Sequence, residues 1–342
     1  MPSNFGFIRT LGTSGSGNTN INNTYELCIN YDLNHLAIAD YGNSRLLVWK
    51  LDGTYYGKLT KYGITDTTAT PHSICYIEGN YYFTDPLQHV VVCVDAVNLT
   101  WKSIFGTIGT SGSSTSTLNS PYGMCAAGKY LYVVDTGNDR VMKLDSNLTY
   151  KGDSGTLLSG TAMVGITYDP THKELYIVDN GNDRVMHVNY RLNDLIQTIG
   201  SSSNLSDPCG CAYIDQLLYV ADYDTNGIVV FETAGASKVT SSLGSGDGAI
   251  TRAYDVIPYR NTILISQYAG DEIMQWYNYS YRRGLTSSTT RKFEDDTPHG
   301  KNPMTLIAGT ELIAGTTQEY GSPNRWIEEE ETIEAHMWTK ET

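Results

Sequence analysis

The sequence predicts an all-β fold, a β-propeller, on three observations. A strand–turn–strand segment at residues 131–145 recurs almost letter for letter at residues 175–189. Apolar strands that end in an acidic or polar residue recur along the chain at similar spacing. Gly, Ser, Thr, Asn and Tyr are abundant and only 18% of the residues are charged, which is a β-rich balance. A period of about 40–50 residues with several short strands per unit is typical of a propeller.

Seven copies of the repeated strand define the predicted units. Each unit has room for four strands, so seven four-stranded blades are the first prediction. Six blades are the alternative, because the last unit keeps the pattern least well. Residues 5–12 form a strand without a blade of its own, and we expect it to close the last blade and remove an exposed sheet edge. The seven strands end at Asp40, Asp85, Asp135, Asp179, Asp222, Gln267 and Thr316.

One propeller domain is expected to span residues 1–342. Two segments depart from the repeat. Residues 284–302 are a long polar insertion, and residues 330–342 are an irregular C-terminal tail. Insertions in repeat proteins occur both on binding faces and as solvated loops, and the sequence leaves both interpretations open for the insertion.

The repeated turn, at residues 135–140 and again at residues 179–184, has an architectural interpretation. Asp135 can accept backbone N–H groups, and Gly137 is expected to adopt a positive φ angle. Arg140 can pair with Asp135 or with a neighbouring blade. We therefore expect the repeated Asp and Arg residues to be architectural rather than to carry chemistry.

These residues resemble the NHL-repeat family of propellers. The family pattern is Pro-x-Gly-apolar, then a strand, then Asp-x-Gly-Asn-x-Arg-apolar, and residues 121–124 with 135–140 match it in full. Residues 40–45 and 179–184 match its second half, and two further units match in part. The resemblance implies the propeller fold. It implies less about function, because such propellers serve as binding platforms and, less often, as lyases or hydrolases.

The composition disfavours several classes of partner and function. The net charge is −14 and no basic cluster extends beyond Arg282-Arg283 and Arg291-Lys292, so neither nucleic acid nor an anionic membrane is expected as a partner. The start of the chain lacks a signal-peptide pattern and no apolar run has the length of a membrane span, so we expect a soluble protein that is cytoplasmic when synthesised. No phosphate-binding loop, nucleophile elbow or dinucleotide fingerprint is present, and no cofactor is expected.

The cysteines fit a structural role. Cys28, Cys75 and Cys125 fall at equivalent places in three successive inner strands. Thr167 and Ala212 occupy that place in the next two strands, so the shared property is small volume. The pattern therefore predicts a crowded position near the propeller axis and no metal site.

A metal-dependent lyase or hydrolase is the first alternative function. Propeller enzymes of this kind place His and acidic ligands at the axial mouth. Glu26, His72 and Asp255 are the candidate ligands at comparable positions of this chain. Because no other feature points to catalysis, an enzyme is the less favoured hypothesis.

Six tyrosines are candidates for a partner-binding surface. The Gly-rich loops and the repeated turns should lie on the same face of the disc, and these tyrosines lie in or beside them. Tyr makes good contacts with proteins and glycans, although packing between blades would explain the same positions. The six are Tyr25, Tyr41, Tyr122, Tyr223, Tyr254 and Tyr268.

The main hypothesis is therefore a non-catalytic platform that binds protein partners in a larger assembly. The abundance of Asn, Ser, Thr, Gly and Tyr resembles that of structural proteins of tailed viruses. A capsid- or tail-associated virion component is accordingly one form of the hypothesis. A glycan-binding adhesin that uses the surface tyrosines is the second alternative function.

Overall fold

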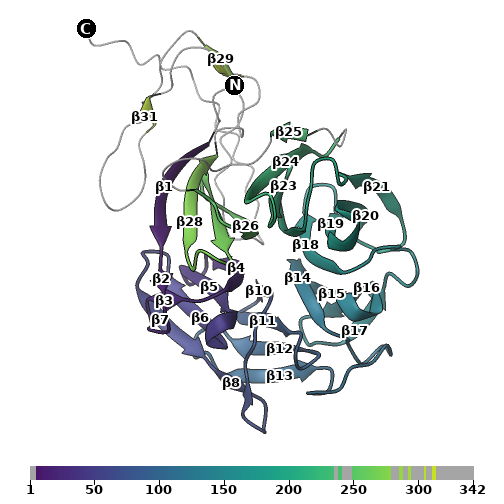
Figure 1. The fold of residues 1–342 in the computed structure, drawn as a ribbon. Helices are drawn as coiled ribbons and strands as arrows, with labels where there is room; N and C mark the ends of the chain where they lie inside the picture. Colours follow the sequence, from purple (N-terminus) through teal and green to yellow (C-terminus); the bar gives the residue numbers. More distant parts are fainter. Residues whose placement is uncertain are drawn as a thin grey trace.

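The protein is an all-β ring of six blades in the computed structural model (Figure 1). The structure describes residues 5–234, 238–240 and 249–278, together with the short strands β29 (Leu285–Ser287), β30 (Lys292–Phe293), β31 (Met304–Thr305) and β32 (Thr310–Leu312). Within these residues, six four-stranded antiparallel sheets surround a central axis. This arrangement confirms the predicted β-propeller.

Each blade runs from an inner strand at the axis to an outer strand at the rim. The first three blades are β4 (Thr24–Asn30), β5 (His35–Asp40), β6 (Arg45–Lys50) and β7 (Tyr55–Leu59); β10 (Ile74–Ile77), β11 (Asn80–Asp85), β12 (Val90–Asp95) and β13 (Trp101–Phe105); and β14 (Pro121–Ala127), β15 (Tyr130–Asp135), β16 (Arg140–Asp145) and β17 (Tyr150–Asp153). The other three are β18 (Met163–Asp169), β19 (Glu174–Asp179), β20 (Arg184–Asn189) and β21 (Leu195–Ile199); β22 (Pro208–Ile214), β23 (Leu217–Asp222), β24 (Gly227–Glu232) and β25 (Lys238–Thr240); and β26 (Ala253–Tyr259), β27 (Thr262–Gln267), β28 (Ile273–Asn278) and β1 (Phe5–Leu11).

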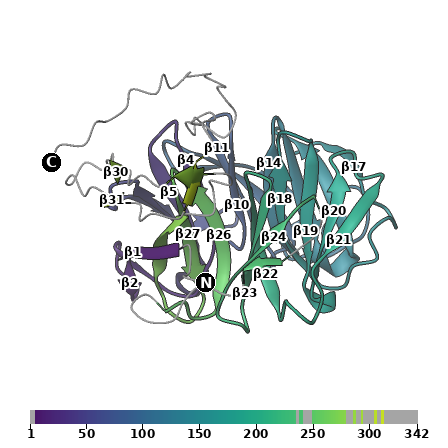
Figure 2. The same ribbon diagram turned by 90° about the horizontal axis from the view of Figure 1, so that it is seen from above.

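The loops that lead into the first two blades each contain a small two-stranded sheet. Strand β2 (Thr13–Ser14) pairs in parallel with β3 (Asn20–Ile21), and β8 (Lys61–Tyr62) pairs antiparallel with β9 (Thr67–Thr68). Figure 2 views the ring edge-on and shows that the blade strands run from one face of the disc to the other. The turns therefore gather on two opposite faces.

The ring closes after six blades, not after the seven that were predicted first. The N-terminal strand β1 pairs antiparallel with β28, so it is the outer strand of the sixth blade, as predicted for the last blade. The inner strand of that blade meets the first blade directly, because the backbone N–H of Leu27 donates to the Asp255 carboxylate at 3.0 Å. Since β26 already packs against β4, the ring has no place for a seventh inner strand.

The last predicted unit, which ends at Thr316, contributes two short strands to the described part of the chain. Strand β31 pairs with β30 and β32 pairs with β29, so they form separate two-stranded sheets. Of the polar insertion at residues 284–302, only β29 and β30 are described. The tail at residues 330–342 lies outside the described residues.

The core lies between neighbouring blades. The second strand of each blade is buried on both of its faces, which explains the near-continuous apolar runs seen in the sequence. Tyr82 and Tyr132 occupy equivalent places in two of these strands and are fully buried. Their hydroxyls donate to the carbonyls of Ser146 and Tyr190 in the next blade, both at 2.6 Å. These tyrosines therefore link adjacent blades through backbone groups.

The repeated Asp and Arg residues hold each turn to the loop that enters the same blade. Arg140 bonds to the wholly buried Asp135 at 2.8 Å and donates to three carbonyls of the preceding loop. Asp135 also accepts the backbone N–H of Asn119 at 2.6 Å. The same ion pair recurs between Asp40 and Arg45 at 2.5 Å, and between Asp179 and Arg184 at 2.7 Å. These contacts stabilise the turns of the fold.

The glycine of the repeated turn has a role different from the one predicted. Gly137 lies in a short 3-10 turn and its φ angle is not positive; the left-handed residue is Asp139, with φ of 50°. A Cβ atom on Gly137 would lie 2.8 Å from the carbonyl oxygen of Asn119. The Gly137 N–H donates to the same oxygen at 2.8 Å. Glycine is required because the loop backbone approaches the turn closely.

Candidate functional site

The six candidate tyrosines converge with His72 on one face of the disc, at the mouth of the axis. We call this face the loop face, because the repeated turns and the loops that enter the blades meet there through backbone hydrogen bonds. Inner strands begin on the loop face and second strands end on it, so residues from both places come together. The resulting aromatic cluster consists of Tyr25, Tyr41, His72, Tyr122, Tyr223, Tyr254 and Tyr268.

Tyr25 is the centre of the aromatic cluster. Its ring centroid lies 4.3 Å from that of His72, 4.5 Å from that of Tyr254 and 4.7 Å from that of Tyr41. His72 in turn lies 4.3 Å from Tyr122. The ring centroid of Tyr268 lies 5.7 Å from that of Tyr25, and the ring centroid of Tyr223 lies 5.8 Å from that of Tyr268. All six tyrosines are half-buried, so the cluster packs across the mouth and still presents aromatic surface to solvent.

Burial keeps the side chains around His72 and Tyr25 uncharged near neutral pH. Burial lowers the pKa of His72 to about 3, and its Nε2 atom lies 2.7 Å from the hydroxyl of Tyr254. Its Nδ1 atom is buried and has no hydrogen-bond partner within the described part of the chain. Burial also raises the pKa of Tyr25, Tyr41 and Tyr254 above the ordinary value for a phenol. The centre of the mouth is therefore uncharged and amphipathic, while the Arg252 guanidinium lies 5.1 Å from the ring centroid of Tyr223.

A polar layer lies directly beneath the aromatic cluster in three of the blades. Glu26, Ser73 and Asp255 follow the aromatic residues on their inner strands, and the Ser73 hydroxyl donates to the Glu26 carboxylate. Burial, reinforced by the charge of Asp255, raises the pKa of Glu26 well above its usual range. Burial raises the pKa of Asp255 to about 7. The two carboxyl groups therefore favour protonation in the folded protein.

In the other three blades, glycine replaces the polar residue of this layer. A Cβ on Gly123 would lie 2.1 Å from the Val164 carbonyl oxygen, and a Cβ on Gly165 would lie 2.3 Å from that of Cys209. Neighbouring inner strands thus touch backbone to backbone on this side of the axis. The carboxyl pair occupies the half of the ring where the strands leave room for side chains.

The three candidate metal ligands are near one another but do not converge on a common point. Glu26 and Asp255 interact electrostatically, and His72 belongs to the aromatic layer above them. In the described ranges, no set of three His, Cys, Asp or Glu ligand atoms within 4.8 Å of one another includes these residues. The arrangement fits a buried polar layer better than a metal-dependent catalytic centre.

The cysteines of the next layer are thiols. Burial raises the pKa of Cys28 to about 12, and it also raises the pKa of Cys75 and Cys125. All six cysteines are free in the structure. A thiol with a raised pKa is a poor nucleophile, so this layer contributes packing near the axis.

One group of chemically active residues was missed by the sequence analysis. Asp169, His172 and Glu174 come together on the face opposite the loop face, at the turn between β18 and β19. Asp-x-x-His-x-Glu across a predicted tight turn is the signal that could have identified them.

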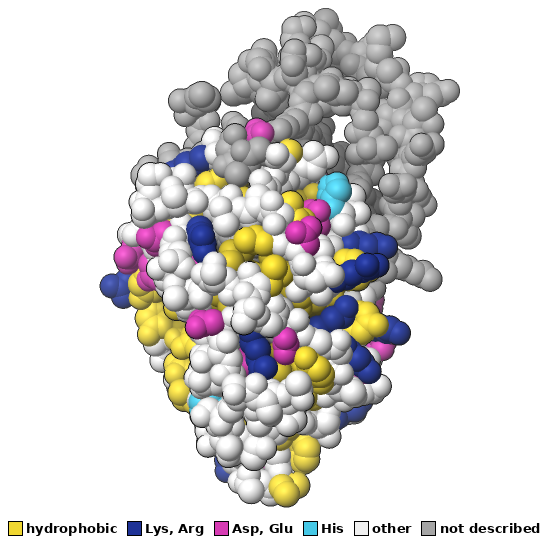
Figure 3. Space-filling view, turned by 90° about the vertical axis from the view of Figure 1, so that its right-hand side faces the viewer, with side chains coloured by type: hydrophobic (Ala, Val, Ile, Leu, Met, Phe, Trp, Pro, Cys, Tyr) yellow, Lys and Arg dark blue, Asp and Glu magenta, His cyan; other side chains and the backbone are white. Residues whose placement is uncertain are grey.

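The rim offers a different surface from the mouth. On the side of the third and fourth blades, hydrophobic side chains lie in small groups among polar and charged ones (Figure 3). Scattered apolar residues are normal for a protein surface. The aromatic cluster differs because its half-buried rings are contiguous.

Comparison with known proteins supports the fold. No family model matches the chain, and no curated protein matches it. Among solved structures, a chain of a crystal structure of a nidogen/laminin complex is similar with a TM-score of 0.56 and 16% sequence identity. The similarity covers 68% of this chain and 83% of that chain, and it shows the fold alone. No helix within the described ranges combines the length and apolar character needed to cross a membrane.

Proposed function

We propose that this chain is a non-catalytic propeller platform that binds a protein partner through the aromatic cluster. The observation that carries the proposal is the convergence of six half-buried tyrosines from four blades into one contiguous surface at the mouth. Tyrosine is enriched among the residues that dominate binding energy at protein interfaces. Its large ring supplies contact area at low cost in side-chain entropy.

The layers below the mouth support a rigid surface. The Ser266 hydroxyl donates to the Tyr25 carbonyl, and the Thr84 hydroxyl donates to the Tyr122 carbonyl at 2.5 Å. Each of these bonds joins two blades, so the backbone beneath the rings is fixed before a partner arrives. A preorganised surface loses less entropy when it binds.

The similarity to a chain from a complex of two proteins is consistent with this use of the fold, although the likeness itself concerns the fold. Residence in a virion is a further proposal that depends on composition alone. Binding of a protein partner through the aromatic cluster does not depend on residence in a virion.

Partner capture with surface variants tests the proposal. The immobilised chain is exposed to an extract of the cells that produce it, and bound proteins are identified by mass spectrometry. The double variant Tyr41→Ala, Tyr268→Ala removes two rings that contact Tyr25. Tyr190→Ala is the matched control, because Tyr190 is half-exposed in a turn on the opposite face.

The expected result is a specific partner that the wild-type chain and the control retain and the double variant loses. Equal capture by all three chains would contradict the proposal. A glycan array run in parallel separates the adhesin alternative: binding to a defined glycan that depends on Tyr41 and Tyr268 would replace the protein partner by a sugar.

A further inference from the structure

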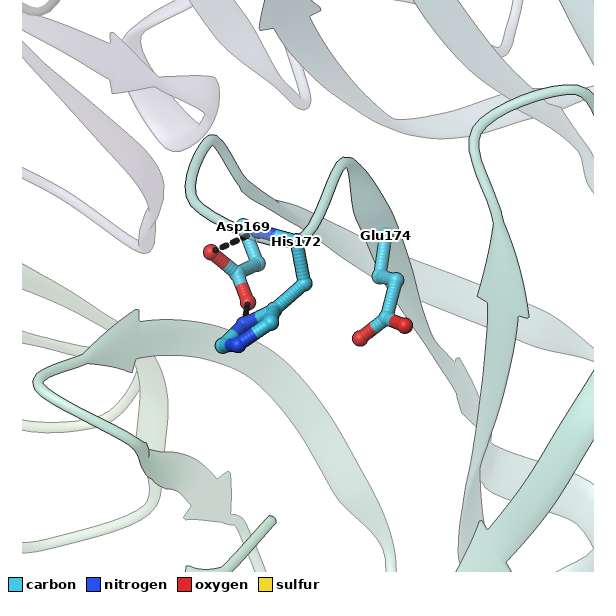
Figure 4. A group of neighbouring side chains, drawn as sticks. All are labelled: Asp169, His172 and Glu174. Carbon is cyan, nitrogen blue, oxygen red and sulfur yellow. Dashed lines mark hydrogen bonds and ion pairs between the residues drawn. The ribbon is translucent and has the colours of Figure 1, made fainter. Parts of the chain in front are cut away.

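The turn between β18 and β19 gathers an aspartate, a histidine and a glutamate. Asp169, His172 and Glu174 each offer one ligand atom, and these atoms lie within 4.8 Å of one another. Figure 4 shows the three polar ends on the same side of the hairpin. Among the residues that the structure describes, no other trio of His, Cys, Asp or Glu meets this condition.

The first blade forms the same turn without these three residues. Asn30 pairs with His35 across that turn, as Asp169 pairs with Glu174 in the fourth blade. The Asn30 side chain accepts the N–H of Leu33 at 3.2 Å. The position of Leu33 corresponds to that of His172.

The hydrogen bond that closes the two turns is the same. Asp169 Oδ1 accepts the N–H of Thr171 at 2.7 Å and that of His172 at 3.3 Å, and an uncharged asparagine makes the bond equivalent to the second in the first blade. The amide oxygen of an asparagine can accept both of these N–H groups. Both turns also place a left-handed residue at the same point, Asn34 with φ of 54° and Lys173 with φ of 59°. The backbone therefore does not require the charge of Asp169 or the ring of His172.

Glu174 is oriented by residues outside the trio. The Gln197 amide nitrogen donates to the Thr233 carbonyl at 2.6 Å, which fixes the orientation of the amide. The same nitrogen lies 3.1 Å from Nδ1 of His187, so that atom is an acceptor and the proton is on Nε2. Nε2 then donates to the Glu174 carboxylate at 2.7 Å. Such a chain of hydrogen bonds typically orients a metal-binding carboxylate.

The trio is anchored at one end and open at the other. Asp169 is fully buried and its Oδ2 atom lies 2.6 Å from Nδ1 of His172. The His172 side chain is 56% exposed, so an ion can reach it from solvent. A buried carboxylate is costly unless it is paired or coordinates a cation.

We propose that Asp169, His172 and Glu174 bind a divalent transition-metal ion of the zinc class. One imidazole nitrogen and two carboxylate oxygens suit such an ion better than Ca²⁺ or Mg²⁺, which prefer oxygen ligands alone. Three protein ligands leave a fourth position for water or for a group from a partner. The site lies on the face opposite the aromatic cluster and is independent of it.

Isothermal titration of Zn²⁺ into the full, untagged, metal-free chain near neutral pH tests the proposal. One ion per chain is expected. His172→Leu and Asp169→Asn copy the residues of the first blade, so each should fold and each should weaken binding at least about tenfold. Glu78→Gln, which removes an exposed carboxylate from the corresponding turn of the second blade, should leave binding unchanged. Circular dichroism verifies that all variants are folded.

Three results would overturn the proposal. The first is the absence of Zn²⁺ binding up to about 1 mM ion. The second is unchanged affinity in the folded His172→Leu and Asp169→Asn variants, which would place the ion elsewhere. The third is preference for Ca²⁺ over Zn²⁺, which would contradict the assigned ion class. Visible absorption from bound Co²⁺, lost in His172→Leu, would independently support the imidazole ligand.

Discussion

Replacing Asp255 by asparagine isolates the electrostatic cost of the carboxyl pair where the ring closes. Asp255 is 5% exposed and accepts the N–H of Leu27 across the junction between the last and first blades. Asparagine has nearly the same shape, and its side-chain oxygen can accept the same N–H group. The substitution therefore removes the ionisable group while it keeps the contact between blades.

The structure gives the sign and the size of the expected effect. Burial raises the pKa of Asp255 from 3.8 to about 7, so at intermediate pH the folded state holds a proton that the unfolded chain has lost. The stability that this group contributes is fully present below about pH 4 and is lost as the pH rises to about 7. At about 1.36 kcal/mol per pKa unit, the loss between about pH 5 and about pH 8 is roughly 2–3 kcal/mol.

Urea unfolding of wild-type and Asp255→Asn chains at these two pH values measures the effect. The free energy of unfolding of the variant, relative to wild type, should increase by roughly 2–3 kcal/mol from the lower to the higher pH. Asp95→Asn is the control: backbone N–H groups lower the pKa of Asp95, so its carboxylate stays ionised throughout this range. A stability difference between Asp255→Asn and wild type that does not change with pH would show that the buried carboxyl of Asp255 does not titrate in this range.

Three further predictions concern the architecture. Gly123→Ala should lower the free energy of unfolding by at least about 3 kcal/mol, because the added Cβ would lie 2.1 Å from a backbone oxygen. Chemical denaturation measures this loss of stability, and a loss below about 1 kcal/mol would contradict the prediction. Arg140→Ala should cost about 3 kcal/mol, since it leaves the buried Asp135 without its cation, and a melting temperature equal to that of wild type would disprove this. Deletion of residues 1–11 should unpair β28 and cause association seen by size-exclusion chromatography, whereas a stable monomer would show that β1 is dispensable.

Local sequence patterns were sufficient to predict the repeat and its turns. The pairing of Asp135 with Arg140 follows from residue types a few positions apart, and the structure shows that pairing. The aromatic cluster could be anticipated for the same reason. Once Tyr25 is placed at the start of an inner strand and Tyr41 after a second strand, the repeat brings both to the loop face.

Features that depend on contacts between segments far apart in the sequence could not be predicted. The number of blades is decided by which strand pairs with β1, and nothing in residues 5–11 specifies β28 as the partner. The role of Gly137 is decided by the approach of Asn119, which the turn sequence does not contain. The orientation of Glu174 depends on His187, which lies thirteen positions later on the neighbouring strand β20. That residue is not part of the turn motif that contains Glu174.

A structure of the chain bound to its captured partner is the sharpest test of partner binding at the aromatic cluster. We predict partner density over the loop face, in contact with the rings of Tyr41 and Tyr268. A partner seated on the rim or on the opposite face, with the aromatic cluster left exposed to solvent, would contradict it.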